Sequence, residues 1–397
     1  MKKKIIVIGP GMHIGGVERS LIGFLESLDA NIMDINLFLV DHQGEFMEFI
    51  PSYINILPED KILSLSKRRI VWLFKHGYYF IGILRLYAKM YSYIISKITR
   101  KPNVNTLRCN KWLMKFIKKQ PEIYDVAFGF YGPYYYLNNK VIAKKKFGWI
   151  HTDYSASDVG VNANFENEVW QKLDRIVCVS KSCKNSFLNI FPNLAFKVIV
   201  IENIISSSFV LEQSTKFVVD DEMPKDGSIN ILSIGRFCTA KAFDEAVIIC
   251  KNLIEKGYHI KWYIIGYGPD NALICREVRK HKMQKYFIIL GKKANPYPYI
   301  RNCDLYVQPS RYEGKAVTVI EAQILGKPVL ISNFATATDQ LKNGFDGWIC
   351  PLGIDGVTKG IQYMLDNPLI MKKIAMNALS IDYSYLCEKK KINEAIQ

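Results

Sequence analysis

The chain lacks any apolar run long enough to cross a membrane. A membrane-spanning helix is signalled by about 18 or more consecutive apolar residues with few or no charges, and no stretch of the 397 residues comes near that length. Three lysines at 2–4 precede only a short apolar run, so we expect no secretory signal peptide either. A chain of this size is long enough for two domains of ordinary dimensions.

Patterns typical of disulfide, zinc and nicotinamide sites are also missing. The nine cysteines are odd in number and scattered, and no C-x-x-C pair occurs. This distribution favours reduced thiols in a cytoplasmic protein. The glycine loop at 9–16 does not complete the dinucleotide-binding pattern G-x-G-x-x-G, because Ile14 stands where the third glycine would be. We therefore expect no cofactor of these kinds.

Acidic residues are absent from residues 61–120, which we call the basic segment. It carries fifteen Lys or Arg, against a net charge of +16 for the whole chain. From 70 to 91, aromatic and aliphatic side chains mix with cations at helical spacing. This mixture is typical of a helix at a membrane interface, where rings enter the headgroup layer and each cation near anionic lipid contributes about 1 kcal/mol. The rings are those of Trp72, Phe74, Tyr78, Tyr79 and Phe80.

Two other interpretations of the basic segment stay open. Its helices could pack on the core as a pair and leave a basic face in water. Concentrated positive charge also suits nucleic acid, although no recognisable nucleic-acid-binding module accompanies it here. We expect an anionic membrane surface, and not nucleic acid, as the partner of the segment.

Apolar runs and turn residues predict an α/β chain. The strands expected in the first half lie at 4–9, 31–40, 54–57, 124–130, 146–154, 174–179 and 197–201. Those expected in the second half lie at 229–234, 260–266, 287–290, 305–307, 329–331 and 348–350. The polar, acidic stretch 206–228 contains Gly and Pro and is expected to link the two halves.

Residues 304–330 predict a strand, a tight loop, a helix and a second strand. Gly314 allows the loop to turn closely beneath a ligand, and Gly326 followed by Lys-Pro stops the helix. The backbone N–H groups of Lys315, Ala316 and Val317 lie at the helix start, where donors are unsatisfied and partial positive charge gathers. A diphosphate would fit on such amides.

Two carboxylates flank this anion site. Glu313 lies in the loop, and Glu321 lies one to two turns into the helix. They could accept hydrogen bonds from hydroxyl groups on either side of a diphosphate, which is the layout of a nucleotide-sugar. Taken alone, two glutamates eight residues apart are more typical of a solvated pair on an ordinary α/β turn.

The residues around the glutamates form a recognisable pattern. Pro-Ser-x-x-Glu-Gly at 309–314, seven residues between the glutamates, and Gly-x-Pro-Val at 326–329 resemble the signature of the family 4 retaining glycosyltransferases of the GT-B fold. The resemblance implies two Rossmann-like domains that face a central cleft. The implied divisions are an acceptor domain with the basic segment inserted, a nucleotide-sugar domain, and a tail helix that packs back on the first domain, at 1–205, 206–380 and 381–397.

The resemblance also assigns roles to residues of the second domain. In that family the first glutamate of the signature, here Glu313, contacts the donor sugar, and the second, here Glu321, contacts the ribose. Gly266 and Gly268 resemble the family's loop on the nucleotide side. The implied donor is a nucleotide-sugar, and UDP is the commoner nucleotide in the family.

Two cations are implied for the donor diphosphate. Arg236 after a strand, and Lys241 at the start of the next helix, resemble a family pattern. An Arg fork matches phosphate oxygens bidentately, and a Lys adds a point charge. The usual Pro-Glu-Lys-Gly of the family is Thr-Ala-Lys-Ala at 239–242 here, so the glycine is missing. Without the resemblance, both cations would be unremarkable surface residues.

Two elements of the first domain resemble the family as well. Gly15 and Gly16, followed by Val-Glu, resemble the N-terminal loop whose backbone faces the donor phosphate and the acceptor, although a plain strand-to-helix turn would look the same. His151, in Trp-Ile-His-x-Asp-Tyr, resembles a histidine that faces the sugar and the reaction centre. Asp153 would orient this histidine or the acceptor. A lone histidine is more often structural.

The implied reaction is a metal-independent transfer of a hexose or another sugar. The chain contains no Asp-x-Asp, the metal motif of GT-A transferases, and preorganised amides and cations would stabilise the leaving diphosphate. The expected acceptor is a membrane-associated glycan or a polyprenyl-diphosphate-linked acceptor on the cytoplasmic face, as in capsule, O-antigen or exopolysaccharide assembly. The alternatives are a GT-B nucleotide-sugar epimerase or phosphorylase, and a non-catalytic membrane-docked protein on the same scaffold.

Overall fold

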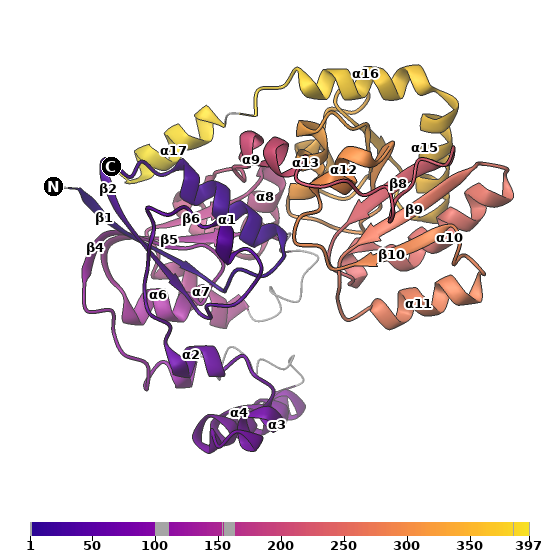
Figure 1. The fold of residues 1–397 in the computed structure, drawn as a ribbon. Coiled ribbons are helices and arrows are strands. Elements are labelled where there is room, and N and C mark those ends of the chain that lie inside the picture. The colour runs from indigo at the N-terminus through magenta and orange to yellow at the C-terminus, as the bar shows by residue number, and fades with distance from the viewer. Residues whose placement is uncertain (1, 100–110, 153, 155–162, 384, 397) are drawn as a thin grey trace.

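Two parallel sheets, each covered by helices, form two lobes that lie side by side (Figure 1). The computed structural model describes residues 2–99, 111–152, 154, 163–383 and 385–396. Both sheets consist of strands that alternate with helices along the chain, and every strand pair in them is parallel. The chain is therefore an α/β protein, as the sequence predicts.

The first lobe holds seven strands in the order β3-β2-β1-β4-β5-β6-β7. Their near-continuous apolar runs suit strands that are covered on both faces, and Ile5, Ile6, Val7 and Ile8 of β1 have no exposed surface. The strands are β1 (Lys3–Gly9), β2 (Met33–Leu39), β3 (Asn55–Ile56), β4 (Ile123–Gly129), β5 (Ile142–Ile150), β6 (Arg175–Cys178) and β7 (Val198–Val200). The helices are α1 (Gly16–Ser27), η1 (Met47–Phe49), α2 (Lys61–Leu65), α3 (Ile70–Lys75), α4 (Tyr79–Thr99), α6 (Tyr134–Lys140), α7 (Ala163–Gln171), α8 (Lys181–Ile190) and η3 (Pro192–Lys197).

The second lobe holds six strands in the order β10-β9-β8-β11-β12-β13. They are β8 (Ile229–Ile234), β9 (Ile260–Ile265), β10 (Phe287–Gly291), β11 (Leu305–Gln308), β12 (Val329–Ser332) and β13 (Trp348–Cys350). The helices are α9 (Ser207–Gln213), η4 (Thr239–Lys241), α10 (Phe243–Glu255), α11 (Asn271–Lys280), α12 (Tyr297–Asn302), α13 (Val317–Ile324), α14 (Ala337–Gln340), α15 (Gly353–Asp366) and α16 (Pro368–Leu379).

The strand order of each sheet reverses at one point. In the first lobe β1 lies between β2 and β4, and in the second lobe β8 lies between β9 and β11. Open α/β sheets bind ligands outside the carboxyl ends of their strands at such points. The loops that follow β1, β4, β8 and β11 are therefore the places where fold geometry favours a site.

The last helix returns to the first lobe. Helix α17 (Leu386–Ile396) follows the second lobe in sequence, yet Ile392 and Ile396 are buried within the apolar core of the first lobe. The Lys3 Nζ also donates a hydrogen bond to the Ile396 carbonyl at 3.3 Å. The chain thus crosses between the lobes twice, once before α9 and once before α17 (Figure 1).

Two local expectations from the sequence are wrong. The stretch 206–228, expected to be a linker, contains helix α9, whose start is capped because the Ser206 Oγ accepts a hydrogen bond from the Phe209 N–H. The helical pattern at 70–91 is not one helix but two, α3 and α4. They are separated at Gly77, whose φ of 79° lies in the left-handed region that favours glycine.

Helices α3 and α4 form a hairpin that projects from the first lobe and lies below it in the view of Figure 1. One side of α4 is buried at Ile81, Ala88 and Ser92, but the other side is apolar as well. Large exposed hydrophobic residues of the hairpin are Val71, Tyr78, Tyr79, Phe80, Ile83, Leu86, Tyr87, Met90, Tyr91, Tyr93, Ile94 and Ile98. Among the described residues, no helix is both long and apolar enough to span a bilayer.

Helix α1 packs closely at Gly23 against the segment around Ile204, where the chain leaves the first lobe. A Cβ at this position would come within 3.0 Å of the carbonyl of Ile204, closer than real Cβ atoms approach. Gly to Ala inside a helix normally stabilises by about 0.5–1 kcal/mol. We expect Gly23→Ala instead to lower the free energy of unfolding by about 1–3 kcal/mol, measured by urea denaturation.

The matched control lies one turn later on the same helix. Ser27→Ala should change the free energy of unfolding by no more than about 0.5 kcal/mol. A Gly23→Ala protein as stable as the parent would show that α1 is not held against Ile204.

Candidate active site between the lobes

A cavity of about 470 Å³ lies between the two lobes, at the carboxyl ends of β1, β4, β8 and β11. Its volume is in the range of small-molecule sites. The candidate residues from the sequence that line it are Gly15, Gly16, His151, Arg236, Lys241, Gly266, Glu313, Lys315, Ala316, Val317 and Glu321. Gly268 and Gly314 do not line it, and Asp153 lies outside the described residues.

Glu313 and Lys241 meet in this cavity. The Lys241 Nζ forms an ion pair with Glu313 Oε1, and both side chains are mostly buried. The same oxygen accepts hydrogen bonds from the Ser310 Oγ at 2.6 Å and from the Gln308 Nε2 at 3.3 Å. The loop after β11 therefore fixes the carboxylate, and the carboxylate holds the lysine at the cavity.

The Lys241 loop depends on two small residues. A Cβ at Gly235 would come within 3.0 Å of the Lys241 stem, so this glycine leaves room for the lysine to reach the cavity. Ala242 has φ 54° and ψ 32°, a left-handed conformation that glycine adopts more easily. Ala242 stands where the family pattern has glycine, and it adopts the backbone conformation typical of glycine.

Arg236 presents its charge at the cavity without a partner. Its side chain is exposed, and no hydrogen bond or ion pair of its guanidinium occurs within the described parts of the chain. Burial raises the pKa of the neighbouring Glu18, while Lys67 and Arg236 act in the opposite direction. Arg236 is thus free to bind an anionic group that enters.

Close backbone crossings explain the glycines at 266 and 268. A Cβ at Gly266 would overlap the Gly235 carbonyl, and one at Gly268 would overlap the Phe237 carbonyl. Both glycines bring the loop after β9 against the loop after β8. Gly266 also lines the cavity, whereas Gly268 does not, and its contact with a ligand stays a prediction.

Gly314 packs against the other lobe, and its predicted contact with a ligand stays a prediction. A Cβ there would come within 3.0 Å of the carbonyl of His151. The imidazole of His151 lies 2.7 Å, through Nε2, from the Phe130 carbonyl, which can only accept, so Nε2 carries the hydrogen. Burial of the ring lowers the pKa of His151 to about 4. The histidine lines the cavity as a neutral group.

The start of α13 is a smaller anion site than the sequence predicts. The N–H of Ala316 donates to the Gln340 Oε1 at 2.7 Å and is therefore not free. The Nζ of Lys315 forms an ion pair with Glu202 of the first lobe. Both partners come from distant parts of the chain, which is why the local pattern could not show them.

Glu321 is bound by partners that the sequence analysis missed. Its carboxylate is almost fully buried, and the Tyr297 hydroxyl donates to Oε1 at 2.7 Å. The Arg19 Nε of α1 lies 3.2 Å from the same oxygen. Arg19 directly follows the Gly-Gly-Val-Glu run, but nothing local indicates that it reaches the second lobe.

Two more cations line the cavity. Lys292 and Lys293 directly follow β10, and their place after an expected strand is a signal that could have found them. The Lys292 Nζ lies 4.8 Å from the ring centre of Tyr267 and forms an ion pair with Glu45 of the first lobe. Within the described residues, no group of three or more His, Cys, Asp or Glu side chains is placed to hold a metal ion.

Comparison with known proteins identifies the second lobe. A family model described as "Glycosyl transferases group 1" matches residues 217–380. The match covers 164 of the 397 residues and lies within the second lobe. Curated relatives include the capsular polysaccharide biosynthesis glycosyltransferase CapM of Staphylococcus aureus, 24% identical over 51% of this chain and 55% of CapM. The O-antigen biosynthesis glycosyltransferase WclY of Escherichia coli is 25% identical over 45% of this chain and 49% of WclY.

The chain spans about half the length of these curated relatives. Solved structures, in contrast, match both lobes together. The complex of Anabaena Alr3699/HepE with UDP and glucose has a TM-score of 0.71 at 14% identity and covers 99% of each chain. The lipopolysaccharide outer core galactosyltransferase WaaB has a TM-score of 0.61 at 17% identity, again over 99% of each chain. The chain therefore has the GT-B fold, and the fold class expected from the sequence is confirmed.

The lowered pKa of His151 can be tested by nuclear magnetic resonance. At about pH 5.5 an ordinary histidine, with a pKa near 6.5, is mostly charged, but His151 should still be neutral with the hydrogen on Nε2. Ring nitrogen shifts of ¹⁵N-labelled protein report this state, and a His151→Gln variant assigns the signal.

Protonation also links His151 to stability. Because its pKa is lower in the folded chain, the unfolded chain binds the proton first as pH falls from about 6.5 towards 4. The parent should lose more stability than His151→Gln over this window. Titration of His151 near pH 6.5 would contradict the assignment.

Proposed function

We propose that the chain is a retaining glycosyltransferase. It transfers a sugar from a UDP-sugar to a membrane-associated glycan or polyprenyl-diphosphate-linked acceptor in surface polysaccharide assembly. The observation that carries the proposal is the convergence of Arg236, Lys241 and Glu313 on a cavity at the carboxyl ends of both sheets. Relatives named as capsular and O-antigen glycosyltransferases support the pathway, and the UDP and glucose bound to HepE support the donor.

The chemistry requires stabilisation of a leaving diphosphate. The bond between the sugar's anomeric carbon and the diphosphate oxygen breaks while the acceptor hydroxyl bonds to the same carbon from the same face. The hydroxyl proton passes to the leaving phosphate oxygen, so no protein base is needed. Arg236 and Lys241 stabilise the charge that develops on the diphosphate, and no metal is required.

Each remaining residue of the cavity has a positioning role in this proposal. When Lys241 binds the diphosphate in place of Glu313, the Glu313 carboxylate is released and contacts the donor sugar. Glu321 contacts the ribose. Neutral His151, with hydrogen on Nε2, leaves Nδ1 as an acceptor for a sugar hydroxyl. Gly15 and Gly16 at the start of α1 face phosphate and acceptor, and the Glu18 carboxylate, which lies where a Cβ of Gly15 would be, moves aside when phosphate binds.

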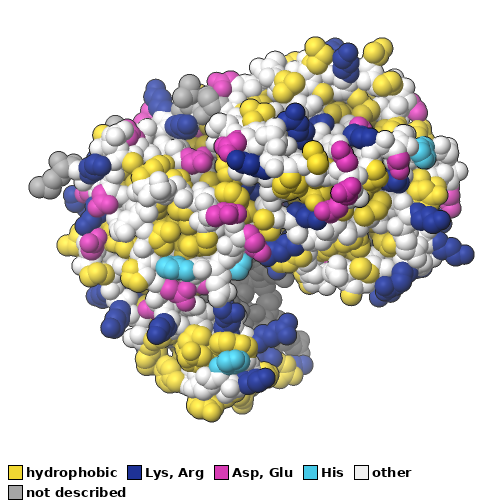
Figure 2. Space-filling view, in the orientation of Figure 1, with side chains coloured by type: hydrophobic (Ala, Val, Ile, Leu, Met, Phe, Trp, Pro, Cys, Tyr) yellow, Lys and Arg dark blue, Asp and Glu magenta, His cyan; other side chains and the backbone are white. Residues whose placement is uncertain are grey.

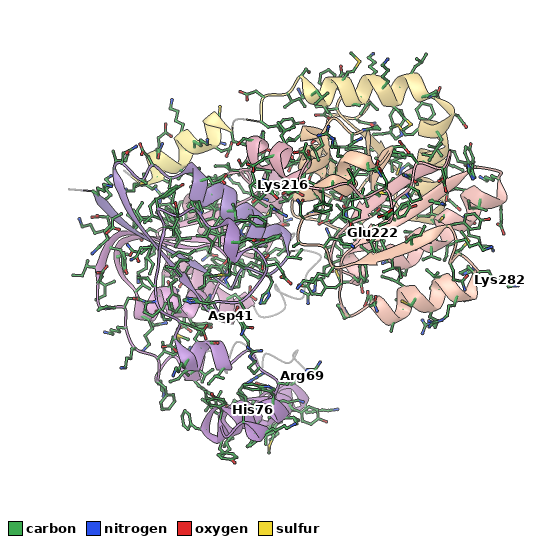
Figure 3. The ribbon with its side chains drawn as sticks, in the orientation of Figure 1. Asp41, Arg69, His76, Lys216, Glu222 and Lys282 are labelled. Atoms are coloured by element: carbon green, nitrogen blue, oxygen red, sulfur yellow. The ribbon has the colours of Figure 1, made fainter. Side chains whose placement is uncertain are left out.

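We propose that the acceptor binds on the side of the basic segment. Lys67, which follows α2, forms an ion pair with Asp41 at 3.0 Å and donates to the Pro10 carbonyl in the loop after β1. Figure 3 shows Arg69 and His76 on the α3–α4 hairpin beyond Asp41. The hairpin is therefore attached to the first lobe at the loops where an acceptor would enter.

The composition of the hairpin favours a lipid surface as its partner. Figure 2 shows apolar and basic side chains gathered together on the projecting hairpin. Helix α4 exposes several large apolar side chains in addition to those that it buries, and an exposed apolar surface of this kind is typical of an interaction site. Lys75, Lys89 and Lys97 are exposed on the same hairpin and suit anionic headgroups.

Loss of either diphosphate cation should slow the transfer. Arg236→Ala and Lys241→Ala should each reduce turnover of a UDP-sugar with a glycan acceptor at least tenfold, about 1.4 kcal/mol of transition-state stabilisation. Nucleoside diphosphate release measures the rate. The matched control, Lys251→Ala, removes a lysine that does not line the cavity and should leave turnover unchanged.

The products distinguish the proposal from its rivals. A transferase releases nucleoside diphosphate together with a glycosylated acceptor, whereas an epimerase converts the nucleotide-sugar without any acceptor, and a phosphorylase needs phosphate. Unchanged turnover in both cation variants would count against the assigned site.

Vesicle flotation tests the hairpin. The parent should float with vesicles of phosphatidylcholine and phosphatidylglycerol at low salt, and less with phosphatidylcholine alone or at high salt. Ile83→Asp together with Ile94→Asp, both exposed on α4, should lose most of the binding.

The control for added charge lies on the other lobe. Leu369→Asp changes an exposed leucine of α16, 81% accessible, and should float like the parent. If the α4 double variant floats as well as the parent, the hairpin is not the membrane contact.

A further inference from the structure

A single cation joins the lobes at the edge of the cavity. Arg19 stands in the first turns of α1 in the first lobe and is only 6% exposed. Its Nε lies 3.2 Å from Oε1 of Glu321 on α13 in the second lobe. The pair is therefore a buried interaction between the two halves of the molecule.

Aromatic rings from three segments hold the Arg19 guanidinium in place. Its central carbon lies 4.2 Å from the ring centre of Phe46, 4.8 Å from that of Tyr297 and 5.6 Å from that of Phe209. Phe46 belongs to the first lobe, Phe209 to α9 and Tyr297 to α12. Such ring contacts suit a planar, weakly hydrated guanidinium better than an ammonium group.

Only one oxygen of Glu321 is used by these partners. Tyr297 and Arg19 both contact Oε1, and Oε2 has no partner among the residues that the structure describes. Glu321 also lines the cavity. The protein therefore orients the carboxylate through one oxygen and leaves the other available to a ligand.

A buried ion pair needs a reason other than stability. Removing two charges from water costs several kcal/mol per ion. Apolar residues of similar size in place of the pair often make a protein equally stable or more stable. Burial raises the pKa of Glu321, whereas Arg19 and the Tyr297 hydroxyl lower it. Arg19 thus favours the charged form of a carboxylate that burial alone would tend to protonate.

We propose that Arg19 is a positioning residue for the nucleotide: from the opposite lobe it fixes one oxygen of Glu321, so that the other oxygen can accept hydrogen bonds from the ribose. This rests on the proposed function, because it takes the ligand to be a nucleoside diphosphate. Glu321 has its full set of contacts only when the lobes meet as they do here. Nucleotide binding and lobe contact are therefore coupled, each favouring the other.

The test measures UDP binding by titration calorimetry, without sugar transfer. Arg19→Met keeps an apolar side chain within the rings and should raise the Kd for UDP at least tenfold. Glu321→Gln should raise it by a similar factor. The double variant should bind no worse than Glu321→Gln, because Arg19 acts through Glu321.

The double variant also guards against misfolding, since it leaves no unpaired buried charge, and thermal unfolding of each variant checks the fold. Arg19→Met that binds UDP like the parent would overturn the proposal. A further loss in the double variant would also overturn it, since Arg19 would then contact the nucleotide directly.

The pH dependence separates positioning from a merely structural role. The charged and titratable groups that face Glu321 are Arg19 of α1, Tyr297 of α12 and Tyr306 of β11, and burial raises the pKa of both phenols, so neither ionises near neutral pH. Without Arg19 the pKa of Glu321 rises further. The ratio of the Arg19→Met Kd to the parent Kd should therefore be larger at the lowest pH at which both proteins stay folded than at the highest. An equal ratio at both would contradict the proposal.

Asp339→Asn is the matched control. It weakens another contact between the lobes, the hydrogen bond of 2.7 Å that the Ser182 N–H donates to the Asp339 Oδ2, and neither residue lines the cavity. It should leave the Kd for UDP within about twofold of the parent. A parent that binds neither UDP nor GDP would instead overturn the proposed function, so the two failures are distinguishable.

Discussion

Gly314 carries no side chain, and the backbone of His151 from the opposite lobe occupies the space that a methyl group would need. This contact lets two parallel sheets present their carboxyl ends to one cavity. His151 and Glu313 line the same cavity, and the start of α1 lies opposite the start of α13. A larger residue at 314 would push the lobes apart and separate the cavity residues of the second lobe from those of the first.

Ion pairs between opposite charges join the residues around the cavity. Lys241 is paired with Glu313, Lys315 with Glu202 and Arg19 with Glu321, in each case with at least one mostly buried side chain. Such pairs are screened by salt much less than surface pairs. Arg236 differs from them, because it has no partner in the described chain. An incoming diphosphate would therefore meet Arg236 as an available charge and compete with Glu313 for Lys241.

Chemistry that is local in sequence could be predicted, and contacts between distant segments could not. Glu313, Lys241 and Gly266 follow strands, so their place at the carboxyl edge of a sheet follows from the strand pattern alone. The Ala316 N–H donates to Gln340, and Arg19 pairs with Glu321. Both contacts join distant segments, and a single sequence does not show that such segments meet. The same holds for the contact of Gly314 with the first lobe.

Two misread elements had local signals. Ser206 could have indicated the start of α9, because serine favours a helix N-cap. Gly77 could have indicated the break between α3 and α4, but the apolar periodicity on both sides hid it. The exposed apolar side of α4 has no sequence signature of its own, since apolar residues at helical spacing usually mean burial in the core.

The return of α17 to the first lobe has a mechanical consequence. The chain leaves the first lobe after β7 and re-enters it before α17, and the two crossings lie together, because the Glu202 N–H donates to the Glu388 carboxylate at 2.8 Å. Two lobes joined by two adjacent chain segments rotate most easily about the axis that passes through both segments. The cavity would then widen and narrow by rotation about that axis, and sliding of one sheet past the other would be resisted.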